Sequence, residues 1–520
     1  MSLLPLVPAP AHASSPGGAP FRLSSGTAIV GDANAADAVA ALRTLIQRRT
    51  GLRLSSVGAA GPGAPTLALE IDRVGRAESY RLRADTASVT VAAADAAGLF
   101  YGVQSLGQLI TATDADWVIP AVQIDDEPRF AYRGVMLDVA RHFFDVDTVR
   151  AYIERAAALK FNVLHLHLTD DQGWRLQLRS RPALTDRASS TAIGGDRGGY
   201  YTQNEYREII AHAAAHHMTV VPEIDLPGHT HAVSLAYPEL CEPPVLSEHV
   251  REVVREYGGD LPTSGAPYEG MAVGFSSLKI HDEATYAFLA DVLGEVAALT
   301  PGPYLHIGGD EALGTSAADY AEFIGRATAL AAATGKTPIT WHEAGASAAL
   351  APGTIGQYWG FVSPTDGADD KARAFVAHGG RLILSPADAI YLDMKFAADA
   401  PLGLTWARGV TSGQRAYEWD AAAVVPGIDD SGILGVEAPL WTETVRTLDD
   451  MDALAFPRIA AAAEAAWSPP WKASEDRTWD SFRARVGDLG PLWARLGIHF
   501  TALPEIDWAT DGARGDGEYS

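Results

Sequence analysis

The sequence predicts an α/β fold in which a (β/α)8 TIM barrel is preceded by a smaller α/β domain. Two observations predict the barrel. Between residues 133 and 493, apolar segments alternate with Ala-rich amphipathic segments, and the apolar segments number eight. Polar and aromatic residues follow each apolar segment, where barrels of this kind carry their chemistry. The alternation indicates a parallel sheet, and eight repeats indicate that the sheet closes.

The composition and periodicity of the first 126 residues predict a separate unit. Residues 1–20 are rich in Pro, Ala, Ser and Gly, a composition typical of a disordered segment. Beyond them, helical and strand periodicities alternate. The predicted helices are 34–49 and 94–110, and the predicted strands are 66–71, 79–84 and 88–92. No catalytic constellation stands out in this region, so we expect it to support the barrel.

The chain therefore divides into four predicted parts, with the barrel strands placed by their apolar runs. These parts are a disordered segment at 1–20, a small α/β domain at 21–126, a catalytic barrel at 127–500 and a tail at 501–520. The barrel strands are predicted at 134–139, 163–168, 219–225, 304–307, 338–342, 354–359, 381–384 and 433–440. Helices are predicted between them, for example at 146–159, 204–216, 283–299 and 317–333.

The composition excludes several classes of protein. Lys and Arg number 40 against 65 Asp and Glu, and the net charge of −25 disfavours nucleic acid and anionic membranes as partners. The single cysteine, Cys241, excludes an intramolecular disulfide and a metal site built from cysteines. No apolar run approaches the ~20 residues that span a bilayer. The amino terminus lacks the basic segment and the long apolar run of an intact signal peptide.

The stretch from Tyr304 to Glu311 reads as a buried strand that ends in two glycines and two adjacent acids. Adjacent carboxylates repel when both are ionised, so one of Asp310 and Glu311 is expected to hold a proton at neutral pH. A protonated acid beside an ionised partner suits acid-catalysed bond cleavage. An isolated Asp-Glu pair would instead indicate a helix N-terminus. The polar and aromatic residues at the other strand ends favour a catalytic site over that interpretation.

The remaining strand ends carry acids, an arginine, histidines and aromatic rings. The residues singled out are Arg141, Asp170, His229, Trp341, Trp359, Tyr391, Asp393, Trp441 and Glu443. Carboxylates and the guanidinium offer paired hydrogen bonds to hydroxyl groups, and Trp faces pack on the apolar faces of sugar rings. The predicted pocket therefore suits a neutral, polyhydroxylated ligand whose glycosidic bond is cleaved.

Several of these motifs together resemble glycoside hydrolase family 20, the β-N-acetylhexosaminidases. The run from His306 to Glu311 (HIGGDE) is similar to the signature of that family. The other matching runs are Leu137–His142 (LDVARH), His165–Asp171 (HLHLTDD), Pro222–His229 (PEIDLPGH), Trp441–Glu443 (WTE) and, in the first domain, Gly98–Gly102 (GLFYG). The resemblance extends from about Phe21 over nearly the whole chain.

The resemblance implies a retaining exo-hydrolase in which the 2-acetamido oxygen of the substrate, and no protein carboxylate, attacks the anomeric carbon. It implies that Glu311 is the general acid and base and that Asp310 orients the acetamido group. It also implies that Tyr391 donates a hydrogen bond to the acetamido oxygen and that the acetamido methyl lies in a pocket of Trp341, Trp359 and Trp441. The implied contacts to the ring hydroxyls come from Arg141, Asp393 and Glu443. Asp170 and His229 are implied to form a relay to Glu311, and Trp406 to stack against the next sugar. The implied substrates are oligosaccharides or glycoconjugates that end in N-acetylglucosamine or N-acetylgalactosamine, and they include chitin fragments. The resemblance implies no cofactor and no metal.

Three alternatives stay open. The pairs His165/His167 and His229/His231 have the spacing of metal ligands on a strand, although the first pair is expected to point into the packed barrel as hydrogen-bonded core residues. The chain could bind sugar without turnover, or it could release a disaccharide in the manner of a lacto-N-biosidase. A secreted protein without its signal peptide is expected from the substrate class, and a cytoplasmic location also stays open. The sequence leaves the oligomeric state, the gluco or galacto preference and the role of residues 235–281 undetermined.

Overall fold

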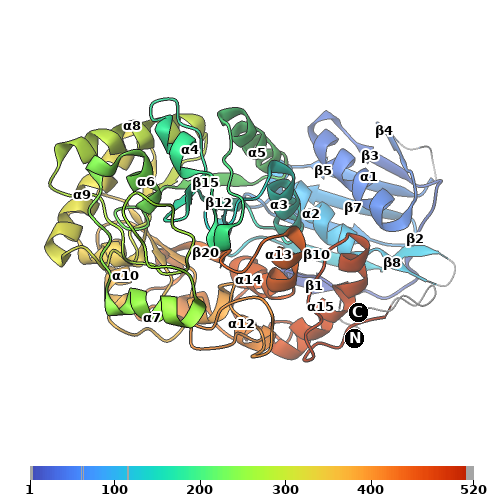
Figure 1. Cartoon of the computed structure of the whole chain (residues 1–520). Helices are drawn as coiled ribbons and strands as arrows, with labels where there is room; N and C mark the ends of the chain where they lie inside the picture. The colour runs from blue at the N-terminus through green and yellow to red at the C-terminus, as the bar shows by residue number, and fades with distance from the viewer. Residues whose placement is uncertain (1–3, 60, 62–63, 114–115, 511–520) are drawn as a thin grey trace. The chain divides into compact units, whose positions relative to one another are not determined.

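The computed structural model describes residues 4–59, 61, 64–113 and 116–510, and these fall into two compact units. The first unit takes in the chain up to residue 131, residues 157–160 and the chain from residue 456 onward. The second unit comprises residues 132–156 and 161–455. Each unit has its own buried core, and Figure 1 traces the chain through both of them from blue to red.

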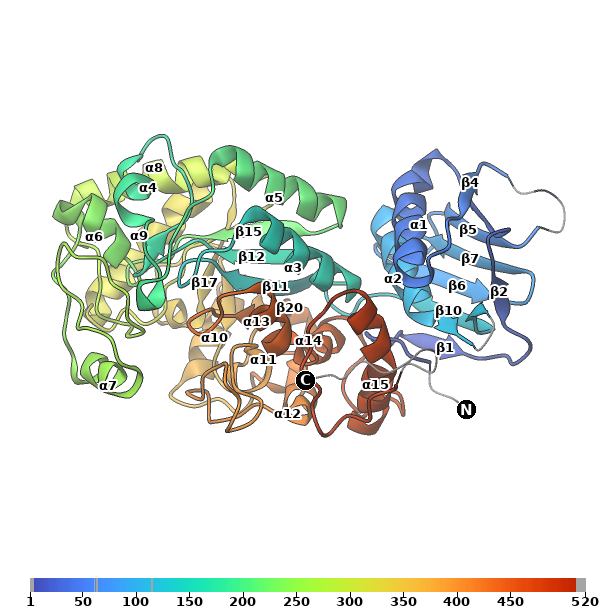
Figure 2. The same ribbon diagram turned by 45° about the vertical axis from the view of Figure 1, so that its right-hand side comes forward.

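The first unit is built on a seven-stranded sheet in the order β1-β10-β6-β7-β5-β3-β4. Helices α1 (Ala36–Thr50) and α2 (Ala96–Leu109) lie side by side against it (Figures 1 and 2). The strands of this sheet are β1 (His12–Ser14), β3 (Ala28–Gly31), β4 (Ser55–Val57), β5 (Thr66–Ile71), β6 (Tyr80–Ala84), β7 (Ser88–Ala93) and β10 (Val122–Asp126). A small second sheet consists of β2 (Phe21–Leu23), β9 (Trp117–Ile119) and β8 (Thr111–Ala112).

The segment predicted to be disordered is partly ordered, and that part of the prediction is wrong. Strand β1 pairs antiparallel with β10, so it forms one edge of the large sheet. Leu6 and Val7 are buried, and the backbone of Val7 both donates to and accepts from the side-chain amide of Gln108. The Pro- and Ala-rich composition conceals these two apolar residues, whose burial depends on partners about a hundred residues away. Residues 1–3 lie outside the described residues.

The carboxyl-terminal boundary also differs from the predicted one. Helices α14 (Arg458–Trp467) and α15 (Trp479–Arg495) belong to the first unit, although we assigned residues up to 500 to the barrel. Glu464 binds them to the amino terminus, since it accepts from the backbone N–H of Ala9 and pairs with the guanidinium groups of Arg477 and Arg485. The described part of the predicted tail packs through buried Leu503 and Ile506, and residues 511–520 lie outside the described residues.

The second unit is a closed parallel barrel of eight strands, as predicted. The strands follow one another around the barrel in chain order, and helices such as α3, α5, α8, α9 and α10 surround them (Figure 1). The barrel strands are β11 (Tyr132–Asp138), β12 (Val163–His167), β15 (Thr219–Glu223), β16 (Tyr304–His306), β17 (Thr337–Trp341), β18 (Ile355–Tyr358), β19 (Leu382–Leu384) and β20 (Ile433–Leu440). Near their amino ends the interior is filled by Tyr132, Val163, Val221, Ile339, Ile355, Ile383 and Leu434.

Side chains cap the start of several helices of this unit. Thr202 and Glu205 form a capping box at the start of α5, and Ser316 accepts from the backbone N–H of Asp319 at the start of α9. The helices are α3 (Val146–Ala158), α4 (Ala183–Ala188), α5 (Gln203–Ala215), α6 (His231–Ala236), α7 (Glu248–Tyr257), α8 (Glu283–Leu299), α9 (Ala317–Ala333), α10 (Ala368–Ala377), α11 (Ala387–Ile390), α12 (Gly413–Tyr417) and α13 (Leu448–Ala455). A short hairpin of β13 (Thr169–Asp170) and β14 (Gly173–Trp174) follows β12. The 3-10 turns of this unit are η2 (Ile193–Gly195), η3 (Pro238–Leu240), η4 (His342–Ala346), η5 (Ala421–Ala423) and η6 (Asp430–Gly432), and η1 (Ala33–Ala35) lies in the first unit.

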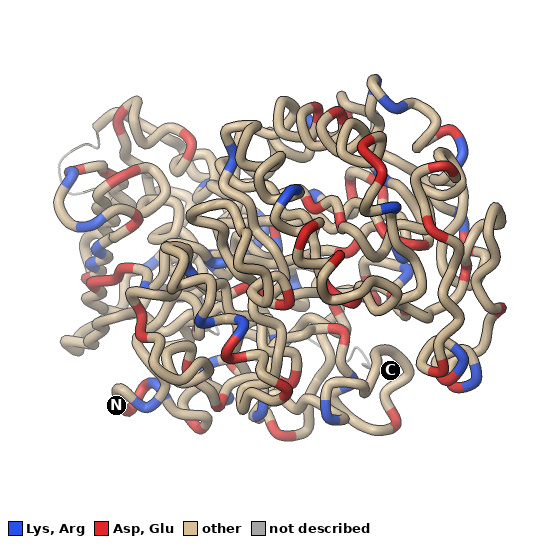
Figure 3. Tube along the Cα trace, turned by 90° about the vertical axis from the view of Figure 1, so that its left-hand side faces the viewer, with Lys and Arg blue, Asp and Glu red and all other residues tan. Residues whose placement is uncertain are grey.

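The excess negative charge is distributed along many segments of the chain. In Figure 3, Asp and Glu are scattered over helices and loops, with Lys and Arg among them. Among the described residues, every helix is too short or too polar to cross a bilayer.

Candidate active site

A pocket of about 240 Å³ contains the side chains that follow the barrel strands. Most of the residues predicted for the site line it: Arg141, Asp310, Glu311, Trp359, Tyr391, Trp406, Trp441 and Glu443. The other predicted residues, Asp170, His229, Trp341 and Asp393, are buried. The structure thus brings together side chains from five of the predicted strand ends around one cavity.

The turn after β16 explains why two glycines precede the acids. A Cβ atom on Gly308 would lie 1.6 Å from Oδ1 of Asp225, so only glycine fits there. The same Asp225 oxygen accepts a hydrogen bond of 3.1 Å from the backbone N–H of Gly309. Glu311 then adopts a φ of 45°, in the left-handed region that non-glycine residues enter rarely and often at functional sites. The turn therefore directs the Glu311 side chain at a conformational cost.

The acids around this turn are crowded, and several of them hold protons more tightly than free carboxyls do. Burial raises the pKa of Asp310 to about 6, an effect that the Glu311 charge increases and His229 opposes. Burial and the Asp310 charge also raise the pKa of Asp225 well above its usual range, and the Asp225 side chain hydrogen-bonds Asp310. Burial, together with the charge of Asp310, raises the pKa of Glu343 to about 8. At neutral pH, Asp310 is therefore ionised beside Asp225 and Glu343, two carboxyls whose raised pKa values favour the protonated form.

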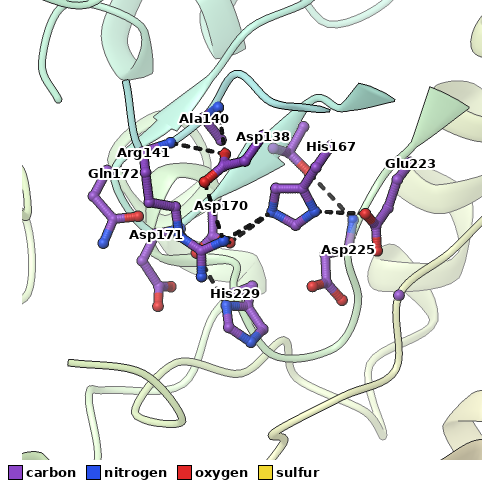
Figure 4. Close-up of polar contacts among 12 residues, drawn as sticks. Asp138, Ala140, Arg141, His167, Asp170, Asp171, Gln172, Glu223, Asp225 and His229 are labelled. Carbon is purple, nitrogen blue, oxygen red and sulfur yellow. Dashed lines mark hydrogen bonds and ion pairs between the residues drawn. The ribbon is translucent and has the colours of Figure 1, made fainter. Parts of the chain in front are cut away.

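A chain of ion pairs joins the first three strand ends to these acids, and Figure 4 shows its part from Arg141 through Asp170 to His229. The Arg141 guanidinium lies 2.8 Å from Oδ2 of Asp170, and Oδ1 of Asp170 accepts from Nδ1 of His229 at 3.0 Å. The other ring nitrogen of His229, Nε2, lies 3.5 Å from a carboxylate oxygen of Asp310 and 3.5 Å from one of Glu311. Burial would raise the pKa of Asp170, but Arg141 and His229 outweigh it and hold the pKa well below the usual range.

His229 itself is cationic in this arrangement. Burial would lower the pKa of its imidazole, but Asp170, Asp225 and Asp310 outweigh that effect and raise the pKa well above its usual value. The predicted association of Asp170 and His229 with the acidic pair is therefore present in the geometry.

Beneath the pocket, His165 and His167 are buried and hydrogen-bonded, as predicted. His167 donates from Nδ1 to Glu223 at 2.5 Å and from Nε2 to Asp170 at 2.7 Å, so both ring nitrogens carry protons. His165 donates to Glu437 at 2.8 Å. Glu223 also accepts from the indole N–H of Trp341 at 2.9 Å. One carboxylate, Glu223, thus holds both Trp341 and His167, whose other ring nitrogen contacts Asp170.

Aromatic rings form much of the pocket surface. The ring of Trp406 lies edge-on to Trp359 at 5.9 Å and to Tyr391 at 5.6 Å, and Trp406 is 45% exposed. Trp441 lies 6.4 Å from Tyr391 and 6.0 Å from Trp341. Trp341 is only 1% exposed and supports Trp441 from behind rather than lining the pocket.

The far side of the pocket pairs a fixed cation with a carboxyl group. Arg141 packs over the Trp441 ring at 4.8 Å, and its side chain is almost fully buried. Burial raises the pKa of Glu443 to about 7, although the nearby Arg141 opposes the shift. Its Oε2 accepts no hydrogen bond from any residue in the described ranges. A ligand hydroxyl would find a fixed donor and an unsatisfied acceptor here.

The sequence analysis missed the part of the pocket that α7 provides. His249, Val253 and Tyr257 line the cavity, and their spacing of four residues places them on one face of the helix. Met271 and Val273, from the loop after α7, also line it. The undetermined segment 235–281 therefore forms a wall of the pocket.

This segment is held in place by its own small core and by polar contacts to the β12 end of the barrel. Val250, Tyr268, Ala272 and Phe275 form the core. Gln172 donates to the carbonyl of Gly270 at 2.9 Å, and Asp171 accepts from the Ser276 hydroxyl at 2.6 Å. The four-residue spacing on α7 is visible in the sequence, but no local pattern shows which surface that face meets. Glu343 lies two residues beyond β17, and its place beside Asp310 appears only in three dimensions.

Comparisons with known proteins agree with this geometry. Residues 130–470 match the sequence model of the glycosyl hydrolase family 20 catalytic domain, and residues 3–127 match that of family 20 domain 2. A β-N-acetylhexosaminidase from Cellulomonas fimi is 39% identical over 98% of both chains.

Solved structures are similar over the whole chain. A family 20 β-N-acetylglucosaminidase is 61% identical with a TM-score of 0.91, and the match covers 98% of this chain and 100% of that chain. A mutant Streptomyces plicatus β-hexosaminidase in complex with its product GlcNAc is 42% identical with a TM-score of 0.87, over 98% of each chain. The motifs, the barrel and the two matched domains together show that this chain belongs to glycosyl hydrolase family 20 and is a glycoside hydrolase.

Proposed function

We propose that the protein is a retaining exo-β-N-acetylhexosaminidase that removes terminal N-acetylglucosamine or N-acetylgalactosamine by substrate-assisted catalysis. The observation that carries the proposal is the placement of the two adjacent acids. Asp310 and Glu311 share one histidine nitrogen, so they reach the pocket from the same side. Two carboxylates that flank a glycosidic bond from opposite faces are the usual alternative, and an adjacent pair suits it poorly.

In the proposed reaction the substrate supplies the nucleophile. The acetamido carbonyl oxygen bonds to the anomeric carbon as the bond to the leaving oxygen breaks, and Glu311 transfers its proton to that oxygen. Glu311 then accepts a proton from water, which attacks the anomeric carbon and reopens the oxazolinium ring. Two inversions at the same carbon give net retention. Holding the acetamido group against the anomeric carbon makes the step effectively intramolecular, which favours it strongly.

The remaining residues have roles that their positions support. Asp310 accepts from the acetamido N–H and stabilises the positive charge of the ring, which requires its ionised form. Tyr391 donates to the acetamido oxygen, and the Asp170–His229 pair holds the positive charge next to both acids. The residues that bind the hydroxyls are Arg141, Asp393 and Glu443, and exposed Trp406 stacks against the next sugar. Trp359 and Trp441 surround the acetamido methyl, and buried Trp341, predicted as a third wall, supports Trp441 from behind.

The substrate class rests on chemistry and on the relatives. A neutral sugar with an N-acyl group matches a pocket of aromatic rings with one fixed cation and several acids. The similar proteins are named for hexosaminidase activity, and the product in one solved structure is GlcNAc. Chitin fragments and glycan termini both present such a residue.

The experiment compares two chromogenic substrates. We expect release of 4-nitrophenol from 4-nitrophenyl N-acetyl-β-D-glucosaminide and none from the β-glucoside that lacks the acetamido group. NMR of the first product should show the β-anomer, as retention requires. Equal cleavage of both substrates would refute substrate assistance. Cleavage of neither, with release of a disaccharide from a longer nitrophenyl glycoside, would instead favour the disaccharide-releasing alternative.

A further inference from the structure

Away from the pocket, two histidines and a glutamate from neighbouring barrel helices converge on one point. They are Glu154 on α3 and His212 and His216, which lie four residues apart at the end of α5. One ligand atom from each of the three lies within 4.8 Å of the others. Nε2 of His212 is 3.6 Å from a carboxylate oxygen of Glu154, and the two imidazole centroids are 4.5 Å apart.

The two histidines are oriented as metal ligands usually are. Nδ1 of His216 lies 2.9 Å from the carbonyl oxygen of His212, and the His212 ring hydrogen-bonds the backbone of Arg150. A ring nitrogen that donates to a carbonyl leaves the other nitrogen with a lone pair, and this arrangement is typical of ligating histidines. Nε2 of His212 is buried and has no hydrogen-bond partner among the described residues.

The surroundings of the cluster favour a cation. The site lies at the carboxyl end of α5, where the helix dipole favours a cation. Arg150 is the opposing charge, but its guanidinium pairs with Asp147 at 3.3 Å and Glu208 at 3.2 Å.

We propose that Glu154, His212 and His216 bind a zinc ion that links α3 to α5. Two imidazoles, one carboxylate and a water molecule complete a tetrahedral shell, and Zn²⁺ accepts this combination of ligands. The ion would stabilise the barrel wall by binding the folded form alone. Because none of the three residues lines the pocket, zinc at this site would leave glycoside hydrolysis unchanged.

The experiment is isothermal titration of the metal-free full chain with ZnCl₂, together with thermal unfolding with and without the ion. We expect one site whose occupancy raises the unfolding temperature. His212→Ala and His216→Ala should each weaken binding by tenfold or more, since even supporting residues of metal sites contribute that much. Glu154→Gln should weaken it less. Substituting Co²⁺ should give the visible absorption of a tetrahedral ion in the parent protein and lose it in both histidine variants.

His281→Ala is the matched control, because His281 also lies 3.0 Å from a carboxylate, that of Asp319, but belongs to no group of three possible metal ligands among the described residues. This variant should bind zinc like the parent. Hydrolysis of the chromogenic substrate by every variant would show that each is folded. Equal zinc affinity in the parent and both histidine variants, or an absence of saturable binding in the folded parent, would overturn the proposal.

Discussion

Two buried clusters of charge, one in each unit, differ in how their charges are balanced. In the first unit, Asp126 accepts from Tyr80 at 2.7 Å, from Lys160 at 2.9 Å and from the indole of Trp467 at 3.0 Å. We call these four residues the Asp126 cluster. Each polar group in it has a donor or acceptor, and the Lys160 ammonium also lies over both aromatic rings.

In the second unit, the acids around the turn after β16 lie close to one another. Asp225, Asp310 and Glu343 crowd one another, and the pKa of each is raised. The comparison indicates that a buried charge with a counter-charge is compatible with a stable fold, whereas crowded acids weaken the fold and are typical of functional sites. Five predictions test this difference.

The largest effect is expected from Glu311→Gln. Loss of a general acid lowers rates by about 10²–10⁴-fold, so hydrolysis of an alkyl or sugar glycoside should fall by that factor. Hydrolysis of the 4-nitrophenyl glycoside, whose leaving group needs little protonation, should fall much less. The ratio of kcat/KM for the two substrates measures the difference. A small and equal loss on both would rule out Glu311 as the acid.

Lys160→Met tests the Asp126 cluster. Removing the ammonium leaves a buried carboxylate without its counter-charge, which costs about 3–5 kcal/mol of stability. Denaturant unfolding of the parent and the variant gives the value. The protein that remains folded should keep its kcat, because Lys160 belongs to the other unit. A loss below about 1 kcal/mol would show that the pairing contributes little.

Asp310→Asn should have the opposite effect on stability. The folded pKa of about 6 lies above the ordinary value, so the ionised carboxyl destabilises the fold at neutral pH. Removing the charge should raise the free energy of unfolding by about 1–3 kcal/mol at pH 7. Activity should fall with both the alkyl or sugar glycoside and the 4-nitrophenyl glycoside. The gain should shrink as the pH falls from about 6 and vanish below about 4, where both states are protonated. Unfolding at pH 7.5 and pH 4 checks both points.

The same carboxyl should govern the acidic side of the pH profile. Since Asp310 must be ionised to hold the acetamido group, kcat/KM should decline as the pH falls through about 6. The residual activity of Asp310→Asn should lack that decline. If the variant and the parent lose activity over the same pH range, a group other than Asp310 determines the pH at which activity declines.

Trp341→Phe should have the smallest effect. It removes the indole donor to Glu223 and leaves a ring next to Trp441. Loss of a buried hydrogen bond to a charged acceptor costs about 1–3 kcal/mol. We expect a modest loss of stability and a rise in KM larger than the fall in kcat. A reversed ratio of these kinetic changes would place Trp341 in the chemical step.

The barrel could be predicted from the sequence because its strands are continuous apolar runs with distinct chemistry at one end. All eight predicted strands are present, and the helices predicted at 283–299 and 317–333 have the same bounds in the structure. The short strands β1 to β4 could not be predicted, because their pairing partners, and not their own residues, define them.

The catalytic-site motifs were local in sequence, and they too could be read directly. Two other features depend on contacts between segments that are distant in the sequence. These are the position of α7 at the wall of the pocket and the hydrogen bonds that join Glu223 to His167 and Trp341 at other strand ends. The expected secretion of the protein stays a prediction.

The most direct measurement is a series of substrates in which the acetamido methyl carries no, one, two or three fluorine atoms. Fluorine withdraws electrons from the carbonyl oxygen and weakens it as a nucleophile with little change in shape. If the substrate supplies the nucleophile, kcat should fall steeply at each step in the parent protein, and the alkyl and 4-nitrophenyl glycosides should show the same trend. A kcat that stays constant across the series would contradict substrate assistance and return the search to a protein nucleophile among Asp170, Asp393 and Glu443.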